Sequence, residues 1–264
     1  MARAITLIGA GRMGSAMARG WVAGGDVALS IVDPAPGGAV RDWAGEVGAA
    51  LNPDPAPADV IVIAVKPQVF PAAIPNITPW IGETTLILSV MAGVTLARLE
   101  ATLGTNRIIR AMPNTPGAIG QGVSVVAPGS GAHEEDYQTA VDLLSPLGLV
   151  EGPLDEAGLV KATAVSGCGP AYVFLLAELM AEAGVARGLD PDLSARIARA
   201  TVEGAAALMA QSEEDPAALR QAVTSPGGVT KAALDVLMAD DAAPSMFERA
   251  FKAAETRDAE LSSE

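Results

Sequence analysis

Apolar and polar residues follow different patterns in the two parts of the chain. Over roughly the first 150 residues, short apolar runs alternate with helical patterns, which predicts parallel βαβ units and a doubly wound α/β sheet. Strands are expected at 3–9, 27–32, 60–65, 84–90, 107–112, 121–127 and 147–151. The Pro-rich segment Asn52–Asp59 predicts a loop between two of them.

The alternation stops near Leu159, where long Ala-rich helical patterns begin. Helices are expected at 157–187, 191–211, 215–224, 229–239 and 243–261. We therefore predict an α/β domain at 1–156 and an all-α domain at 157–264. Small residues give such helices little core of their own but let them approach closely, which favours a homodimer built from this domain. A monomeric bundle packed on the first domain is the alternative.

Composition limits the environment and the partners of the protein. The chain of 264 residues is 50% apolar but only 3% aromatic, so its core is expected to be aliphatic. Apolar runs such as Val60–Val65 are too short to cross a bilayer, and the N-terminal residues show no signal-peptide pattern. One cysteine fits a reducing compartment, and a net charge of −14 argues against nucleic acid and anionic membranes. A cytoplasmic protein is expected.

A glycine-rich motif follows the first expected strand. Gly9, Gly11 and Gly14 have the spacing G-x-G-x-x-G, with the apolar run Ile5–Ile8 before them and a helical pattern after them. Such glycines permit a tight turn, a close approach of pyrophosphate and close packing of helix on strand. The motif predicts a Rossmann-like dinucleotide-binding domain, and a glycine-rich turn without a ligand is the alternative.

Asp33 ends the second expected strand, nineteen residues after Gly14. An acidic residue at this place accepts hydrogen bonds from the adenosine ribose and repels a 2′-phosphate, which favours NADH over NADPH. Arg12 or Arg41 could still meet such a phosphate, and Asp33 could also be a simple turn residue before Pro34.

A second motif, Thr224–Lys231, is a glycine-containing turn that leads into a helical pattern. The free N–H groups of a helix start, together with the helix dipole, form a site for a carboxylate or phosphate. The hydroxyls of Ser225 and Thr230 lie at the two ends of this turn. An ordinary helix with Ser at its cap and Pro at its first position is the alternative.

The residues available for catalysis are few. Lys66 and Asn114 follow strand ends, where ligands bind in a doubly wound sheet, but no His or Cys does. His133 is expected at the surface near a helix start, and Cys168 is expected to be a small packing residue. Acyl transfer, thiol chemistry and metal-dependent hydrolysis are therefore poorly supported, and no metal site is expected.

Hydride transfer to a C=N bond suits this inventory. The cofactor carries the reactive atom, and a cyclic imine arrives largely protonated, so the protein needs no strong acid. A hydroxyl that hydrogen-bonds the ring nitrogen is sufficient, and Thr230 can supply one. A 2-hydroxy-acid dehydrogenase would instead need a general acid or base in the crevice.

Several motifs together resemble the pyrroline-5-carboxylate reductase family. These are LIGAGRMGSAM near the N-terminus, AVKP at 64–67, MPNTP at 112–116, SGCGPAYVF at 166–174 and the TSPGGVTKAAL stretch. The resemblance implies reduction of 1-pyrroline-5-carboxylate to L-proline with NADPH or NADH, the last step of proline biosynthesis. It also implies a helical homodimer whose active site joins the nucleotide domain of one subunit to the helices of its partner. In the family such dimers often assemble further into rings.

The resemblance also implies roles for individual residues. Those expected at the pyrophosphate are Gly9, Gly11, Arg12, Met13 and Gly14. Ala64, Val65 and Lys66 are expected beside the nicotinamide, Asn52 near the adenosine ribose, and Asn114 at the border of cofactor and substrate. The loop for the substrate carboxylate is expected to consist of Ser225, Gly227, Gly228, Val229 and Thr230.

For the chemistry itself, Thr230 is also expected to contact the ring nitrogen, and Glu213 to pair with Lys66. A solvated surface lysine and an ordinary loop glutamate are the alternatives for that pair. Two positions depart from the usual family pattern: Cys168 replaces the serine of SGSGP, and Asp33 is an acid where many members have none. A β-hydroxyacid dehydrogenase or imine reductase, and a non-catalytic dinucleotide-sensing dimer, are the other functions considered.

Overall fold

The computed structural model describes residues 2–25 and 27–263. They form two compact units, of which the first holds the chain up to Cys168 together with the stretch from Ala254 onward. The second unit is Gly169–Ala253. The predicted domain boundary between residues 156 and 157 stays a prediction.

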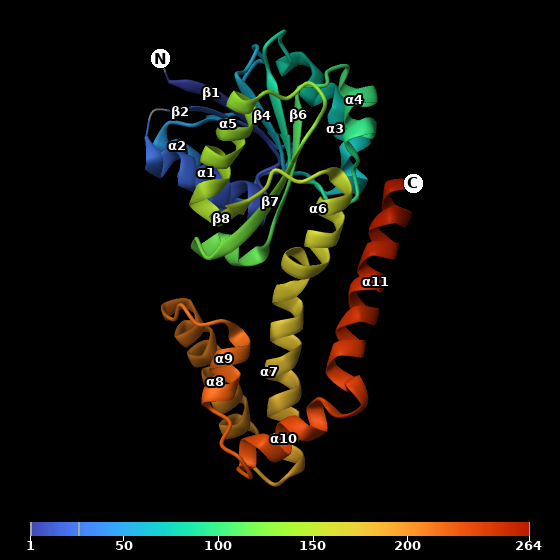
Figure 1. Ribbon diagram of the computed structural model, residues 1–264. Helices are drawn as coiled ribbons and strands as arrows, with labels where there is room; N and C mark the ends of the chain where they lie inside the picture. The colour runs from blue at the N-terminus through green and yellow to red at the C-terminus, as the bar shows by residue number, and fades with distance from the viewer. Residues whose placement is uncertain (1, 26, 264) are drawn as a thin grey trace. The chain divides into compact units, whose positions relative to one another are not determined.

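Within the described residues of the first unit, eight strands form one sheet (Figure 1) in the order β3-β2-β1-β4-β5-β6-β7-β8. The strands are β1 Arg3–Ile8, β2 Val27–Val32, β3 Ala50–Leu51, β4 Val60–Ile63, β5 Leu86–Ser89, β6 Ile108–Pro113, β7 Gly122–Pro128 and β8 Gly148–Glu151. The strand order reverses between β1 and β4, and in an α/β sheet a ligand binds outside the carboxyl ends of the strands at such a point.

The doubly wound α/β fold is confirmed, with one difference in strand direction. All neighbouring strands are parallel except β6 and β7, which run antiparallel. The expectation of parallel units throughout was wrong for this pair. Only a 3-10 turn, Thr115–Ile119, joins the two strands, whereas a parallel crossover needs a dozen residues or more. The short strand β3 was not predicted, because two residues show no periodicity.

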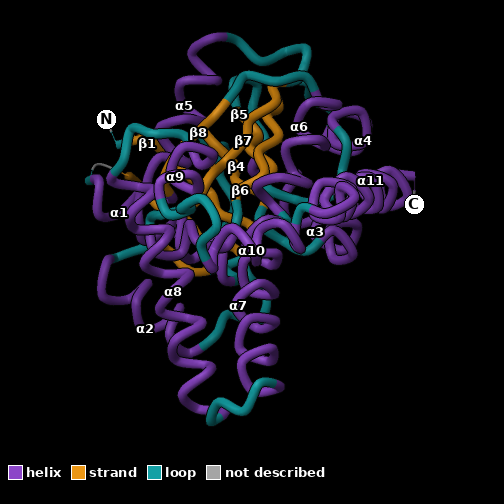
Figure 2. The backbone as a smooth tube through the Cα atoms, turned by 60° about the horizontal axis from the view of Figure 1, so that its bottom comes forward, coloured by secondary structure: helices purple, strands orange, loops and turns teal. Residues whose placement is uncertain are grey.

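Helices cover both faces of the sheet (Figure 2), and the strands β1, β2, β4, β5 and β6 supply residues to both cores by alternation. In β4, Val60 and Val62 face one core, whereas Ile61 and Ile63 face the other. The first core includes residues of α1, α2 and α5, and the second includes residues of α3 and α4. These helices are α1 Arg12–Gly24, α2 Gly38–Val47, α3 Phe70–Ile77, α4 Leu96–Leu103 and α5 Glu134–Leu144.

The later part of the chain is helical, as expected. The first expected helix is divided by a π-helical turn, Thr163–Gly167, and the linker to α11 contains a 3-10 turn at Ala239–Asp241. The helices are α6 Glu156–Ala162, α7 Gly169–Ala186, α8 Pro191–Gln211, α9 Pro216–Ala222, α10 Val229–Leu237 and α11 Ala242–Ser263. By length and composition alone, the stretch Glu156–Ala186 is apolar enough to cross a membrane.

In the second unit, local contacts fix helix starts and helix pairs. Asp190 caps α8 by accepting a hydrogen bond from the Leu193 N–H at 2.9 Å. The Ser194 hydroxyl donates to the Ala181 carbonyl at 2.7 Å and joins α8 to α7. Tyr172 of α7 meets Phe247 and Phe251 of α11, with ring centroids 6.1 Å and 6.0 Å away. Much of α7 nevertheless remains exposed and apolar, including Phe174 at 66%.

An ion pair closes the amino-terminal edge of the sheet. The guanidinium of Arg107, just before β6, lies 2.6 Å from the carboxylate of Asp136 in α5. Burial alone would raise the pKa of Asp136, but hydrogen bonds from Arg107 and from the His133 backbone outweigh it and lower that pKa. His133 itself is the exposed N-cap of α5, as expected.

Asp136→Asn should lower the free energy of unfolding at pH 7 by about 2 kcal/mol, since it leaves the Arg107 charge without its partner. Because folding lowers the pKa of Asp136 below its ordinary 3.8, this stabilisation is complete above that value. It is lost as the pH falls through the lowered pKa, so the difference between variant and wild type should shrink at a pH below 3.8.

Denaturant unfolding of both proteins at one protein concentration and at both pH values measures this difference. Asp142→Asn is the control, because Asp142 lies exposed on the same helix and its carboxylate accepts a hydrogen bond only from Gln138 among the described residues. A pH-independent difference for Asp136→Asn would contradict the role of the ion pair.

Candidate functional site

The three glycines of the N-terminal motif have three different surroundings. Gly9 has φ = 92°, and a Cβ there would lie 2.8 Å from Val65 Cγ1. A Cβ on Gly14 would lie 2.2 Å from the Gly9 carbonyl oxygen, so only glycine lets α1 pack this closely on the turn. Around Gly11, in contrast, no described atom other than those of Gly11 and its two chain neighbours lies within 4 Å of a Cβ. The turn is closed on its inner side and open where a ligand would approach.

The start of α1 lies at this opening. Gly11 is its N-cap, and no side chain among the described residues caps it. The Ser15 hydroxyl points back to the Gly11 carbonyl at 2.7 Å, so it does not satisfy the first-turn N–H groups. Arg12 is exposed and Met13 is half-buried. Uncapped N–H groups and the helix dipole together make this a site for an anion.

Asp33 holds the glycine-rich turn from the end of β2. Its carboxylate accepts hydrogen bonds from the Ala10 N–H and the Ala35 N–H, both at 2.9 Å. The side chain of Asn52 in turn binds the backbone of Asp33 twice, accepting from its N–H and donating to its carbonyl, each at 2.9 Å. Motif spacing does not predict this chain of contacts, because Ala10, Asp33 and Asn52 are far apart along the chain.

A cavity of about 310 Å³ lies beside the glycine-rich turn, at the point where the strand order reverses. Its walls come from the ends of β1, β2 and β4 and from α3. Six of the predicted cofactor residues line it: Gly9, Gly11, Asp33, Ala64, Val65 and Lys66. The structure thus brings together predicted cofactor residues from three strand ends.

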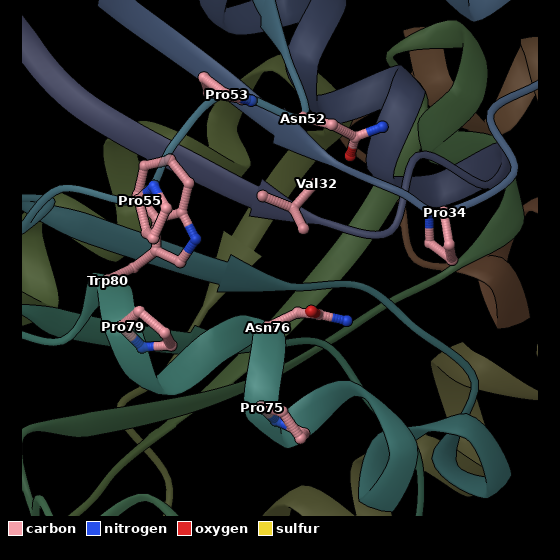
Figure 3. A pocket seen from close by; sticks show the side chains of 9 residues that line it. All are labelled: Val32, Pro34, Asn52, Pro53, Pro55, Pro75, Asn76, Pro79 and Trp80. Carbon is pink, nitrogen blue, oxygen red and sulfur yellow. The ribbon is translucent and has the colours of Figure 1, made fainter.

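A second cavity, of about 320 Å³, shares Val32, Pro34 and Asn76 with the first. On one side lie Asn52 and the prolines of the Pro-rich loop; on the other lie residues of α3 and the following turn (Figure 3). The full lining is Val32, Pro34, Asn52, Pro53, Pro55, Pro75, Asn76, Pro79 and Trp80. Proline rings and an indole suit a flat, largely apolar group. Asn76 and Trp80 were not predicted, since no motif marks them.

Asn114 lies at the carboxyl end of β6 and is nearly buried. Its side-chain oxygen accepts a hydrogen bond from the Val123 N–H at 2.9 Å, and its nitrogen donates to the Ser166 carbonyl at 3.0 Å. Its amide is therefore committed within the protein. The expectation that Asn114 borders cofactor and substrate stays a prediction.

The predicted substrate loop lies in the second unit and opens onto a helix start. Gly227 has φ = 70°, and Gly228 is the N-cap of α10, with no side-chain cap among the described residues. The alternative of a helix capped by Ser225 is therefore wrong. Val229 is 90% exposed, and Thr230 is also exposed. The N–H groups of this first turn are available to an anion.

The remaining predicted residues lie at the surface. Lys66 is exposed at the start of the 3-10 turn Pro67–Val69 in the first unit, and Glu213 is exposed between α8 and α9 in the second. Their pairing stays a prediction. Cys168 is half-buried with a free thiol. In the described part of the chain, no cluster of three or more His, Cys, Asp or Glu side chains could hold a metal ion.

Comparison with known proteins agrees with this arrangement. A family model described as "Pyrroline-5-carboxylate reductase dimerisation" matches residues 156–261, and one described as "NADP oxidoreductase coenzyme F420-dependent" matches residues 4–93. The pyrroline-5-carboxylate reductase of Pseudomonas aeruginosa is 38% identical over 97% of this chain and 96% of its own length. That of Escherichia coli is 36% identical over 90% of both chains.

Solved structures give the same result. A pyrroline-5-carboxylate reductase from Coxiella burnetii matches with a TM-score of 0.88 at 32% identity, over 98% of both chains. A Plasmodium falciparum pyrroline carboxylate reductase with NADP bound matches with a TM-score of 0.80 at 26% identity, also over 98% of both chains. The expected fold, dimerisation domain and nicotinamide cofactor are confirmed, and the chain belongs to the pyrroline-5-carboxylate reductase family.

Proposed function

We propose that this protein reduces 1-pyrroline-5-carboxylate to L-proline and prefers NADH as hydride donor. The observation that carries the proposal is the cavity beside the glycine-rich turn, where six predicted cofactor residues meet. It lies in a chain that matches pyrroline-5-carboxylate reductases over nearly its whole length.

The cofactor fits the residues present. The pyrophosphate would lie at Gly11, where the backbone is open, and at the uncapped N–H groups of Arg12, Met13 and Gly14. The adenine would occupy the proline-lined cavity that continues from the first one, with Asn52 at its ribose end. Ala64, Val65 and Lys66 would line the nicotinamide side.

The start of α10 would hold the substrate. Its uncapped N–H groups, with Ser225, Gly227, Gly228 and Val229, would bind the carboxylate of the imino acid. The exposed hydroxyl of Thr230 would hydrogen-bond the ring nitrogen and hold the C=N carbon in a fixed position. The bound cofactor supplies the hydride, and the product amine keeps the proton with which the imine arrived.

Lys66 and Glu213 would act together. We propose that the Glu213 carboxylate pairs with the Lys66 ammonium when an active site forms between subunits, and so keeps that ammonium beside the nicotinamide. Both side chains are exposed in this single chain, which leaves them available for such a pairing.

Asp33 supports the preference for NADH. Each of its carboxylate oxygens has one backbone N–H partner and retains acceptor capacity for the ribose hydroxyls. Its negative charge is held in place at the cavity and would repel a 2′-phosphate. The relative solved with NADP is only 26% identical, so its bound cofactor says little about this chain. The preference for NADH therefore rests on Asp33.

We also propose that the dimers assemble into a ring and that the protein acts in the cytoplasm. The exposed apolar residues of α7, in the stretch apolar enough to cross a membrane, belong to the matched dimerisation region, which supports their burial against a second copy. The free thiol of Cys168 fits a reducing compartment.

Asp33→Asn should reduce the preference for NADH over NADPH, measured as the ratio of the two kcat/KM values, by about tenfold, or ~1.4 kcal/mol. The variant removes the charge but keeps one oxygen as acceptor for a backbone N–H. Asp54→Asn, an exposed change of equal charge in the Pro-rich loop, should leave the ratio unchanged. A wild type that strongly prefers NADPH would refute this role of Asp33.

Thr230→Ala should fold normally and lose about 1.5–3 kcal/mol of transition-state stabilisation, the range for hydrogen bonds to charged groups. Thr230→Ser keeps the hydroxyl and should recover much of kcat/KM. Thr201→Ala is the control, since the Thr201 hydroxyl on α8 already donates to the Ile197 carbonyl at 2.7 Å. An unchanged kcat/KM in Thr230→Ala would rule out the contact with the ring nitrogen.

Sedimentation velocity of the wild type tests the assembly. A ring predicts a species of several dimers that persists on dilution. A species with the mass of two chains would mean that only the helical interface forms, and it would rule out the ring. A mass of one chain at micromolar concentration would contradict both.

A further inference from the structure

One face of β6 holds the segment that leads from the sheet into the second unit. Side chains two residues apart on a strand point to the same face, so Arg110, Met112 and Asn114 share one side of β6. Arg110 is 2% exposed and pairs with Glu156 at the start of α6. Met112 packs with Leu159 one turn further along.

Asn114 makes the last of these contacts, to the π-helical turn Thr163–Gly167. In this turn the Cys168 N–H reaches back five residues to the Thr163 carbonyl at 3.0 Å. Such wide turns are rare and are found frequently at functional sites. The Asn114 nitrogen donates to the Ser166 carbonyl, which lies inside the turn.

The same amide also fixes the neighbouring strand. Its oxygen accepts from the Val123 N–H of β7, so one side chain bridges β7 and the π-helical turn. The oxygen faces an N–H group and the nitrogen faces a carbonyl, so a flipped amide would place like groups against each other. Asn114 is therefore held in a single orientation.

The position of this bridge links it to the reaction. β1, β4, β5 and β6 are parallel, so Asn114 lies at the sheet edge to which Gly9 and Val65 also belong. The π-helical turn is followed, after Cys168, by Gly169, where the second unit begins. The second unit contains α10 and its proposed substrate loop.

We propose that Asn114 is a positioning residue: its amide clamps the π-helical turn Thr163–Gly167 to the cofactor edge of the sheet, and so sets where the chain leaves towards the substrate-binding helices. It acts through this turn and not by touching the cofactor. The activity part of the inference rests on the proposed function, whereas the clamp itself does not.

Two variants separate the two hydrogen bonds. Asn114→Ala removes both, whereas Asn114→Asp keeps an oxygen for Val123 and places a second acceptor against the Ser166 carbonyl. In both, kcat/KM for pyrroline-5-carboxylate should fall about 10- to 100-fold, the cost of a small misplacement of substrate. The Kd for NADH should stay within about twofold of wild type, since no cofactor contact is lost. Amide hydrogen exchange should become faster at 163–168 and remain unchanged at 5–15.

Gln138→Ala is the matched control, because it removes an exposed side-chain amide on α5 and should keep wild-type values. If both Asn114 variants fail to fold, Gly167→Ala disturbs the turn without changing Asn114. Its Cβ would lie 3.0 Å from Thr163 Cγ2. It should show the same loss of kcat/KM with unchanged NADH binding.

Different failures point to different errors. NADH binding weakened tenfold or more in Asn114→Ala would make Asn114 a cofactor ligand and overturn the proposal. Three other results would also overturn it. They are wild-type turnover in Asn114→Asp, wild-type exchange at 163–168 in both Asn114 variants, and wild-type turnover in Gly167→Ala despite faster exchange. If the wild type itself fails to reduce pyrroline-5-carboxylate, the proposed function is wrong, and the exchange data still decide whether the clamp exists.

Discussion

The close approach of Gly14 to the Gly9 carbonyl is the constraint on which the cofactor edge depends. With a Cβ only 2.2 Å from that oxygen, any larger residue would push α1 away from the end of β1. The position of α1 fixes the turn, and the Ala10 N–H within the turn fixes the carboxylate of Asp33. Asn52 then binds the backbone of Asp33 and places the Pro-rich loop. One steric contact thus determines, through three hydrogen bonds, the wall of the second cavity.

Each unit contains a helix start that can attract an anion. α1 and α10 each begin after a glycine N-cap, with no side chain among the described residues to satisfy the first-turn N–H groups. A protein with a net charge of −14 repels an anionic cofactor and substrate at long range. Helix starts counter this locally, because their partial charges act only within the first turn. The global charge and the local sites are therefore compatible.

The sequence predicted those features that rest on local pattern. Buried strands such as Val60–Ile63 are continuous apolar runs, and α8 begins at an Asp-Pro pair, so both were recognisable. The antiparallel β7 was missed because strand direction depends on the length of a connection and not on the strand itself. The π-helical turn was missed because its residues continue a helical pattern.

The candidate site residues also fall into those predicted by local pattern and those that depend on distant parts of the chain. The spacing of the glycine motif predicts how closely other groups approach Gly9, Gly11 and Gly14, since the roles of all three follow from one turn geometry. The spacing of motifs does not predict contacts between residues far apart in the sequence, such as Asp33 with Ala10 or Asn114 with Ser166. Trp80 and Asn76 become part of a cavity only because α3 lies opposite the Pro-rich loop (Figure 3).

The helical unit links the proposed activity to the assembly of the protein. No residue of α7 is buried in the single chain, although Val173, Phe174 and Leu176 are large and apolar and are 45%, 66% and 53% exposed. Such a surface is costly in water and becomes favourable only when another apolar surface covers it. The dimerisation family model over 156–261 supports a second copy as that cover. The unit that carries the proposed substrate loop is therefore stabilised by the partner, so dilution below the dimer's Kd should weaken substrate binding before it disturbs the first unit's sheet.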